Sequence, residues 1–209
     1  NKIISKKTFY TGKALNVAIG VARLGADAFA TGFMYNENGN MFEQALDKEG
    51  VPFSFVWNNG RVRENYKCID KKSMLTEIND VGGQVSEEKL VDLLQMIRST
   101  SMRADVTVIS GGLPRGVGAE YYRELFRAVD SRSLRIADTE GTKLFAALEA
   151  EIDLVKPNID ELEQTLGREF TDKSEILSGC RELLDRGAKA VLLSLGKDGA
   201  IITDGHKNY

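Results

Sequence analysis

VKPNIDEL, residues 155–162, joins the end of a predicted strand directly to the start of a predicted helix. A short apolar run stops at Lys156, and a helical pattern with acidic residues in its first turn follows Asn158. Asparagine is a preferred N-cap, and Glu161 stands at the third helical position, so the pair can satisfy each other's free backbone donors. Strand ends that face helix starts are also where open α/β sheets bind ligands. This stretch alone leaves capping and ligand binding open.

Composition limits the class of protein. The chain has 209 residues, of which 42% are hydrophobic and 28% charged, as in ordinary globular domains. A net charge of −3 gives no electrostatic reason to expect nucleic acid or an anionic membrane. No apolar run approaches the roughly 20 residues that span a bilayer, and no signal peptide opens the chain. Cys68 and Cys180 match no metal or redox spacing. We therefore expect a cytoplasmic protein with two reduced thiols.

Strand and helix patterns alternate along most of the chain. Apolar runs predict strands at 28–34, 105–112, 134–141, 153–155, 190–196 and 199–205. Amphipathic patterns predict helices at 15–22, 40–50, 86–97, 121–129, 144–148 and 174–187, and a further helix that begins after Asn158. This alternation is typical of an α/β fold: a doubly wound, mostly parallel sheet with helices on both faces.

A different pattern interrupts this alternation between residues 53 and 80, where short strand-like pieces replace the helices. Residues 1–10 also alternate weakly. We predict that 1–10 and 53–80 form a small β-sheet lid, and that 11–52 and 81–209 form the α/β core. Arg63, Asn65 and Lys67 alternate along one of these pieces, so they should share one face of a strand.

Two groups of residues have the chemistry to hold an anion. "TGKALN" (11–16) places Lys13 and Asn16 at a helix start, where backbone N–H groups and the helix dipole favour negative charge. Arg63 and Lys67, on one strand face, would clamp a phosphate, which arginine can bind with two hydrogen bonds. In both places the plain alternative, a solvated surface lysine or strand face, stays open.

Glycines follow nearly every predicted strand, among them Gly111, Gly141 and Gly196. They are either turn residues or positions where loops approach a ligand at the carboxyl edge of the sheet. Neither the phosphate-loop nor the dinucleotide-binding glycine pattern is present. His206 is the one histidine in the sequence, so a nucleophile activated by histidine is disfavoured.

Taken in order, these segments resemble the PfkB branch of the ribokinase-like sugar kinases, and within it the 1-phosphofructokinases and tagatose-6-phosphate kinases. "TGKALNVA" is similar to the family's sugar-binding G-G-K-G-x-N, and "VRENYK" to its T-R-x-N-x-K lid strand. "SGGLPRG", "DTEG", "KPNIDELE" and "SLGKDGA" resemble S-G-S-L-P-x-G, D-T-S-G, K-P-N-x-x-E-L and S-L-G-x-x-G-A. The resemblance implies a ribokinase-like fold and transfer of phosphate from ATP, with Mg²⁺, to a ketohexose phosphate. Fructose 1-phosphate is the first choice of substrate and tagatose 6-phosphate the second.

The resemblance also implies roles for individual residues. The phosphosugar would meet Gly12, Lys13, Asn16, Arg63, Asn65, Lys67 and Gly111. ATP would meet Lys156, Asn158, Ser194 and Gly196. The Asn158–Glu161 pair would organise Mg²⁺ and its water shell, in agreement with the oxygen ligands that this ion prefers.

The sequence departs from the family pattern in several places. Thr11 and Ala14 replace glycines of the sugar-binding segment, which leaves the identity of the sugar open. Neither the family's N-P-x-x-D strand nor its G-A-G-D loop, which carries the catalytic base, occurs in the sequence. We therefore assign no catalytic residue, interpret the chain as part of a longer kinase, and expect these 209 residues alone not to phosphorylate a sugar. A catalytically silent sugar-phosphate or nucleotide sensor is the alternative from another class. The apolar side of the lid, with Phe53, Phe55 and Trp57, would cover a partner's lid in a homodimer.

Overall fold

The computed structural model describes residues 3–209, which divide into two compact units, 3–89 and 90–209. The boundary falls in the first turn of helix α3 (Glu87–Ser101). Among the described residues, no helix is both long and apolar enough to cross a membrane.

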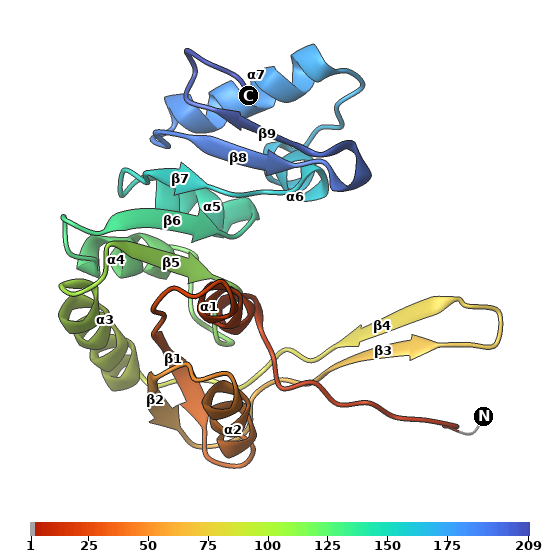
Figure 1. The fold of residues 1–209 in the computed structure, drawn as a ribbon, viewed down its shortest axis with the longest axis vertical. Coiled ribbons are helices and arrows are strands. Elements are labelled where there is room, and N and C mark those ends of the chain that lie inside the picture. Colours follow the sequence, from red (N-terminus) through yellow and green to blue (C-terminus); the bar gives the residue numbers. More distant parts are fainter. Residues whose placement is uncertain (1–2) are drawn as a thin grey trace. The chain divides into compact units, whose positions relative to one another are not determined.

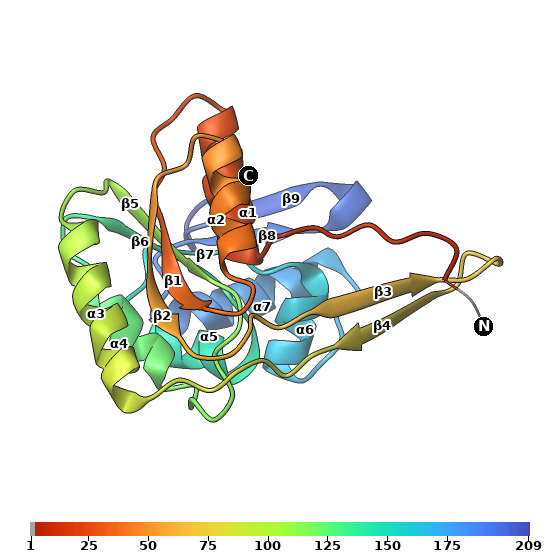
Figure 2. The same cartoon turned by 90° about the horizontal axis from the view of Figure 1, so that it is seen from below.

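Unit 1 is built on two parallel strands, β1 (Ala30–Tyr35) and β2 (Phe53–Asn58). Helices α1 (Lys13–Arg23) and α2 (Asn40–Lys48) lie alongside these strands (Figure 2). The two helices and two strands share one apolar cluster, because the helices present residues at helical spacing and the strands present alternate residues. Its buried members are Ala18, Ala30, Met34, Phe42, Leu46, Val51 and Phe55.

The prediction that 53–58 belongs to the lid sheet is wrong. Phe53 and Phe55 are in register with Ala30 and Gly32 of β1, and the two rings stack with centroids 5.5 Å apart against the unit 1 core. Phe55 is buried in that core and Phe53 is half-buried against it, whereas Trp57 is 38% exposed. Residues 3–10 form no strand, so the predicted pairing of 1–10 is also wrong for the part that the structure describes; residues 1 and 2 lie outside it.

The remaining part of the predicted lid is an antiparallel hairpin of β3 (Asn65–Ile69) and β4 (Leu75–Asn79). It projects from the rest of unit 1, and all its strand residues are exposed (Figure 1). Its turn is stabilised by Asp70, whose carboxylate accepts hydrogen bonds from the backbone N–H groups of Lys72 and Met74 at 2.7 and 2.9 Å. The hairpin therefore holds its shape through its ladder and turn, without a covering layer in unit 1.

Unit 2 contains a five-stranded sheet in the order β5-β6-β7-β8-β9, in which β9 alone is antiparallel. The strands are β5 (Val106–Ser110), β6 (Leu134–Asp138), β7 (Leu154–Val155), β8 (Val191–Ser194) and β9 (Ala200–Thr203). The helices between them are α4 (Tyr121–Ala128), α5 (Gly141–Leu148), α6 (Ile159–Leu166) and α7 (Lys173–Asp185), and the short helix η1 (Gly196–Asp198) precedes β9. The predicted α/β class with a mostly parallel sheet is confirmed.

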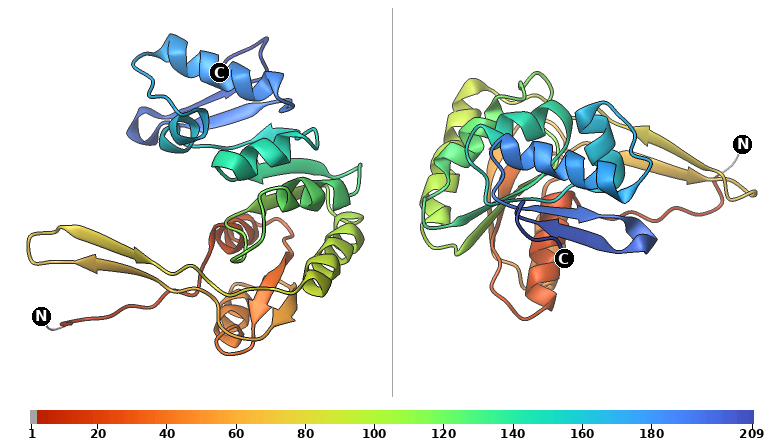
Figure 3. Two further views of the ribbon diagram at one scale, coloured as in Figure 1. Left: turned by 180° about the vertical axis from the view of Figure 1, so that it is seen from behind. Right: turned by 90° about the horizontal axis from the view of Figure 1, so that it is seen from above.

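The core of unit 2 lies between this sheet and the helices. Parallel strands that follow one another in space are joined by right-handed crossovers, which bring successive helices to the same face. Helices α4–α7 accordingly lie on one face of the sheet (Figures 2 and 3). Val155, Val191 and Leu193 point into this layer and are fully buried. Each large side chain buried there stabilises the fold by about 1.5–3 kcal/mol.

The two cysteines should differ sharply in reactivity. Cys68 is exposed on β3, whereas Cys180 is fully buried in α7, and burial raises the pKa of the Cys180 thiol to about 11. Because the thiolate is the reactive form, an aromatic disulfide reagent should label Cys68 in the native protein and Cys180 only in denaturant. Equal native labelling rates, measured by mass spectrometry of the two peptides, would contradict the packing of α7.

Candidate functional site

The candidate site in unit 2 lies at the edge where the parallel strands end. Strands β5, β6, β7 and β8 all point their carboxyl ends to this edge, because they are parallel neighbours. The loops that leave them carry the residues that were predicted to bind a nucleotide or phosphate. Such an edge is the usual ligand site of an open α/β sheet.

The Asn158–Glu161 pair forms the predicted capping box at the start of α6. The side-chain oxygen Oδ1 of Asn158 accepts from the N–H of Glu161 at 2.8 Å, and Oε2 of Glu161 accepts from the N–H of Asn158 at 3.0 Å. Asn158 also forms a bridge to Ser194, the last residue of β8. Capping is therefore confirmed, and the bridge places Ser194 beside Asn158.

Lys156 faces the carboxylate of Asp138, which the sequence did not predict as part of the site. Its ammonium nitrogen lies 3.5 Å from Oδ1 of Asp138, whose other oxygen accepts from the hydroxyl of Ser110 at 3.1 Å. Asp138 is 8% exposed and ends β6, while Ser110, in register with it, ends β5. The three residues form a polar row across three strand ends, with the lysine at its more exposed end.

Gly111 and Gly196 begin two of the loops at this edge. Both have positive φ angles, +103° and +60°, which glycine adopts more easily than other residues. Their role as turn residues is therefore explained. A side chain added at either position would meet no atom within 4 Å, so the backbone is also open to approach. The two interpretations of these glycines are thus compatible.

The other predicted residues belong to unit 1. Gly12 is the N-cap of α1, Lys13 is its first residue, and the first turn contains no acidic side chain. The Thr11 hydroxyl donates a hydrogen bond to the side-chain carbonyl of Asn16. This leaves the amide N–H₂ of Asn16 as its outward donor, which suits an oxygen-rich ligand.

The remaining three predicted residues, Arg63, Asn65 and Lys67, lie on β3 of the hairpin or just before it. Lys67 pairs across the strands with Glu77 at 2.7 Å, and Asn65 stands opposite Asn79 on the same face. Arg63 precedes β3 at the same alternation. The ion pair of Lys67 satisfies its charge on the exposed strand face, so of the predicted clamp Arg63 is the stronger candidate for a phosphate.

The chemistry of the Asn158–Glu161 pair suits Mg²⁺ held through water. Residues 3–209 contain no group of three or more His, Cys, Asp or Glu side chains that could hold a metal ion directly. One carboxylate and one amide oxygen nevertheless match an ion that keeps most of its water and takes one or two protein oxygens. Glu161 is 9% exposed, so its charge acts with little screening.

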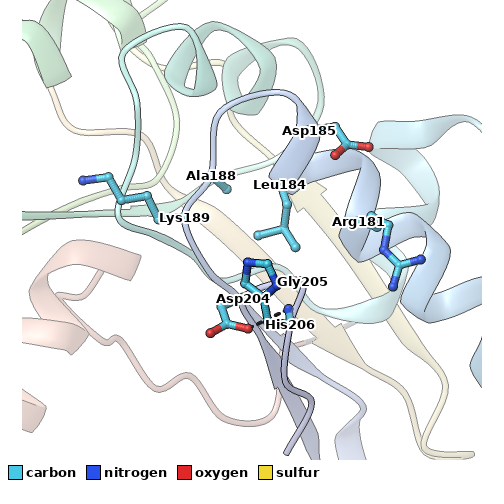
Figure 4. A pocket seen from close by; sticks show the side chains of 8 residues that line it. All are labelled: Arg181, Leu184, Asp185, Ala188, Lys189, Asp204, Gly205 and His206. Carbon is cyan, nitrogen blue, oxygen red and sulfur yellow. Dashed lines mark hydrogen bonds between the residues drawn. The ribbon is translucent and has the colours of Figure 1, made fainter.

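A hollow in unit 2 lies at the edge of the sheet opposite to the candidate site (Figure 4). Two of its charged groups are already engaged: Asp204 accepts from the backbone N–H of His206 at 2.9 Å, and Lys189 donates to Asp153 at 2.7 Å. Hydrogen bonds from the backbone N–H groups of Lys207 and His206 lower the pKa of Asp204. At Asp153 burial acts to raise the pKa, but hydrogen bonds from Lys189 and from the N–H of Arg135 lower it overall. None of the predicted site residues lines this hollow.

Two buried hydroxyl groups beneath the site were also missed from the sequence. Tyr122 of α4 donates to the carbonyl oxygen of Gly111 at 2.6 Å. Thr165 of α6 accepts from the N–H of Gly141 at 2.8 Å. Both residues stand at core positions of amphipathic helices, where sequence alone gives no sign of a loop partner.

The chain is similar to known proteins along nearly its whole length. The sequence model of the pfkB family carbohydrate kinases matches residues 4–209. The 1-phosphofructokinase of Haemophilus influenzae is 28% identical over 202 residues, which are 96% of this chain and 64% of the relative. That of Escherichia coli K12 is 31% identical, over 91% of this chain and 61% of the relative.

A solved structure gives the same result for the fold. The tetrameric inhibited form of phosphofructokinase-2 from Escherichia coli matches with a TM-score of 0.81 and 28% identity, over 93% of this chain and 65% of that one. The chain thus spans less than two thirds of the length of each of these relatives. The family match, the shared fold and the strand-end residues agree, and the chain belongs to the pfkB family of carbohydrate kinases.

Proposed function

We propose that the protein to which this chain belongs transfers the γ-phosphoryl group of ATP to a ketohexose phosphate, with fructose 1-phosphate as the substrate and fructose 1,6-bisphosphate as the product. The observation that carries the proposal is the set of polar groups at the carboxyl edge of unit 2: Lys156 with Asp138, and the Asn158–Glu161 pair beside Ser194. The relatives named 1-phosphofructokinase support the choice of sugar.

In this reaction a sugar hydroxyl attacks the γ-phosphorus while the bond to the β–γ bridging oxygen breaks, which releases ADP. Positioning and electrostatics supply most of the rate. Lys156 would neutralise charge on the nucleotide phosphates, and Ser194 and Gly196 would contact the nucleotide. Asn158 and Glu161 would hold the water shell of Mg²⁺, which when bound draws off charge from the phosphate oxygens. We assign the acceptor of the hydroxyl proton to no residue of this chain.

The sugar phosphate would be bound by residues of unit 1. The N-terminal backbone of α1, with Gly12 and Lys13, favours an anion, and Asn16 offers its amide donors. Arg63 would grip the phosphate, with Asn65 and Lys67 beside it on the hairpin. We propose that the hairpin acts as a lid that excludes water when sugar is bound. Gly111 would approach the sugar through its backbone.

A substrate panel tests the proposal in the protein at the length its gene encodes. ADP release should follow fructose 1-phosphate with a higher kcat/KM than tagatose 6-phosphate, which is the alternative substrate. A preference for tagatose 6-phosphate would reverse the choice of sugar. Binding of sugar phosphate or ATP without turnover of any ketohexose phosphate would favour the silent sensor and sink the kinase proposal.

Replacing Arg63 with lysine should raise the KM for the sugar about tenfold, because losing one charged hydrogen bond of the guanidinium fork costs more than 1 kcal/mol. The KM for ATP should stay within twofold. Arg61 offers a matched control, since it is exposed and pairs with Glu64 at 2.7 Å. The same change at Arg61 should leave both constants unaltered, and equal effects of the two variants would remove Arg63 from the site.

We also propose a homodimer in which the hairpin is covered by a second copy. A lone two-stranded hairpin is marginally stable in water, and Tyr66 and Ile78 stand opposite each other on one face, 46% and 58% exposed. Sedimentation should give a dimer that Ile78→Glu converts to a monomer; a monomeric wild type contradicts the proposal. The exposed thiol of Cys68 supports a reducing, cytoplasmic location.

A further inference from the structure

We infer that the buried hydroxyl groups of Tyr122 and Thr165 are positioning groups: each fastens one loop of the site from beneath, the first on the sugar side and the second on the nucleotide side. The inference rests on the proposed function for the meaning of the two sides. The contacts themselves lie within unit 2.

Tyr122 holds the loop that follows β5. Its side chain is 1% exposed, and its hydroxyl donates to the carbonyl oxygen of Gly111 at 2.6 Å. Gly111 is also tied to the next strand, because its N–H donates to the carbonyl of Asp138 at 3.4 Å. Burial raises the pKa of Tyr122 to about 12, so the phenol stays protonated and keeps donating throughout the neutral range.

Thr165 holds the loop that follows β6. Its hydroxyl donates to the carbonyl oxygen of Glu161, one turn earlier in α6, at 2.6 Å. The hydroxyl oxygen of Thr165 in turn accepts from the N–H of Gly141, the first residue of α5, at 2.8 Å. Thr165 is 8% exposed, so water competes little for either contact. One atom thus links the end of the Asp138–Gly141 loop to the helix whose start carries Asn158 and Glu161.

Neither hydroxyl is needed to build its own helix. The carbonyl of Glu161 belongs to a helical turn that does not depend on the Thr165 side chain, and Tyr122 packs mainly through its ring. What each hydroxyl adds is a fixed distance between a loop and the element below it. A misplacement of reacting groups by about 1 Å can cost about 100-fold in rate. Removing either hydroxyl should therefore act on the site more than on the fold.

The chain offers a matched control for each hydroxyl. Tyr121, the neighbour of Tyr122, is also buried, and its hydroxyl donates to the carbonyl of Leu90 at 2.7 Å. Thr203 is buried, and its hydroxyl oxygen accepts from the N–H of Gly205 at 3.1 Å, as that of Thr165 does from Gly141. Thr203 ends β9 at the opposite edge of the sheet, because it is in register with the first residue of β8.

The experiment compares Tyr122→Phe and Thr165→Val with Tyr121→Phe and Thr203→Val in the complete protein. Binding of fructose 1-phosphate is measured by calorimetry, and binding of a fluorescent ATP analogue is titrated at several Mg²⁺ concentrations. Tyr122→Phe should weaken binding of the sugar phosphate about 10-fold and change the dissociation constant of the nucleotide less than twofold. Thr165→Val should weaken Mg²⁺-dependent nucleotide binding about 10-fold and change the dissociation constant of the sugar phosphate less than twofold. Thr165→Ser, which keeps a hydroxyl, should bind the nucleotide as the wild type does.

The two controls should change neither binding constant, although their melting temperatures should fall about as much as those of the test variants. A fall in melting temperature alone, with both binding constants kept, would overturn the inference and leave the hydroxyls purely structural. So would equal effects on the two ligands. Turnover is assayed separately: a wild type that binds both ligands but transfers no phosphate would contradict the kinase proposal, while the binding measurements would still decide the roles of Tyr122 and Thr165.

Discussion

Replacing Glu161 with glutamine should lower kcat by about 10- to 100-fold and raise the Mg²⁺ concentration needed for half-maximal rate, while the free energy of unfolding falls by about 1 kcal/mol or less. The amide keeps an oxygen that can accept from the N–H of Asn158, so the capping box survives. It loses the charge that would hold the hydrated ion. Initial rates over a Mg²⁺ series, with thermal unfolding of the same samples, separate the two effects.

Helix α7 supplies the control for this experiment. Glu175 stands at the third position of that helix, where its carboxylate accepts from the N–H of Thr171 at 2.8 Å while Asp172 caps the N–H of Glu175 at 2.9 Å. Glu175→Gln should cost a similar amount of stability and nothing in rate. An unaltered Mg²⁺ dependence in Glu161→Gln would remove the metal role and leave the residue as a cap.

Replacing Gly187 with alanine should destabilise the protein by roughly 3–5 kcal/mol, the largest loss that we expect from a single methyl group. Gly187 has φ of +123°, a torsion that L residues rarely adopt. An added Cβ would stand 2.4 Å from the carbonyl oxygen of Leu148, a backbone atom that cannot move away cheaply. The Gly187 carbonyl also accepts from the N–H of Ile152 at 3.1 Å. A shift of the Gly187 backbone would therefore break a hydrogen bond between the segments that lead into β7 and β8.

Gly167 separates the two causes of this loss. It ends α6 in the left-handed conformation, with φ of +67°, and a Cβ there would meet nothing within 4 Å. Gly167→Ala should therefore cost only about 1–2 kcal/mol, from backbone strain alone. Denaturant unfolding measures both variants. Similar losses of stability for the two variants would mean that the backbone around Leu148 moves aside easily, which would contradict the close contact between Gly187 and Leu148.

Sequence patterns were sufficient to predict a local conformation where residues close together in the chain decide it. Asn158 and Glu161 were expected to cap each other, and they do, because a capping box depends on neighbours three residues apart. Residues 53–58 were placed in the wrong sheet for the opposite reason. Alternating apolar residues describe a half-buried strand equally well in either sheet, and the choice depends on pairing with β1, more than 20 residues away in the chain.

The site shows the same limit. Lys156 was singled out by its position after a strand, but its partner Asp138 could not be, since the pairing needs the register of β6 and β7. The roles of Tyr122 and Thr165 were still harder to predict from the sequence. A buried tyrosine or threonine on an amphipathic helix has the same sequence pattern whether its hydroxyl holds a loop or merely its own helix.

The strand order of unit 2 has a consequence for how the protein is made. Because β5, β6, β7, β8 and β9 are neighbours in the sheet in the same order as in the chain, each new strand emerging from the ribosome finds its partner already synthesised. No earlier strand has to wait for a later one to be inserted beside it. The sheet can thus grow strand by strand at one edge during translation, and each newly added strand is an exposed, aggregation-prone edge until the next one pairs with it.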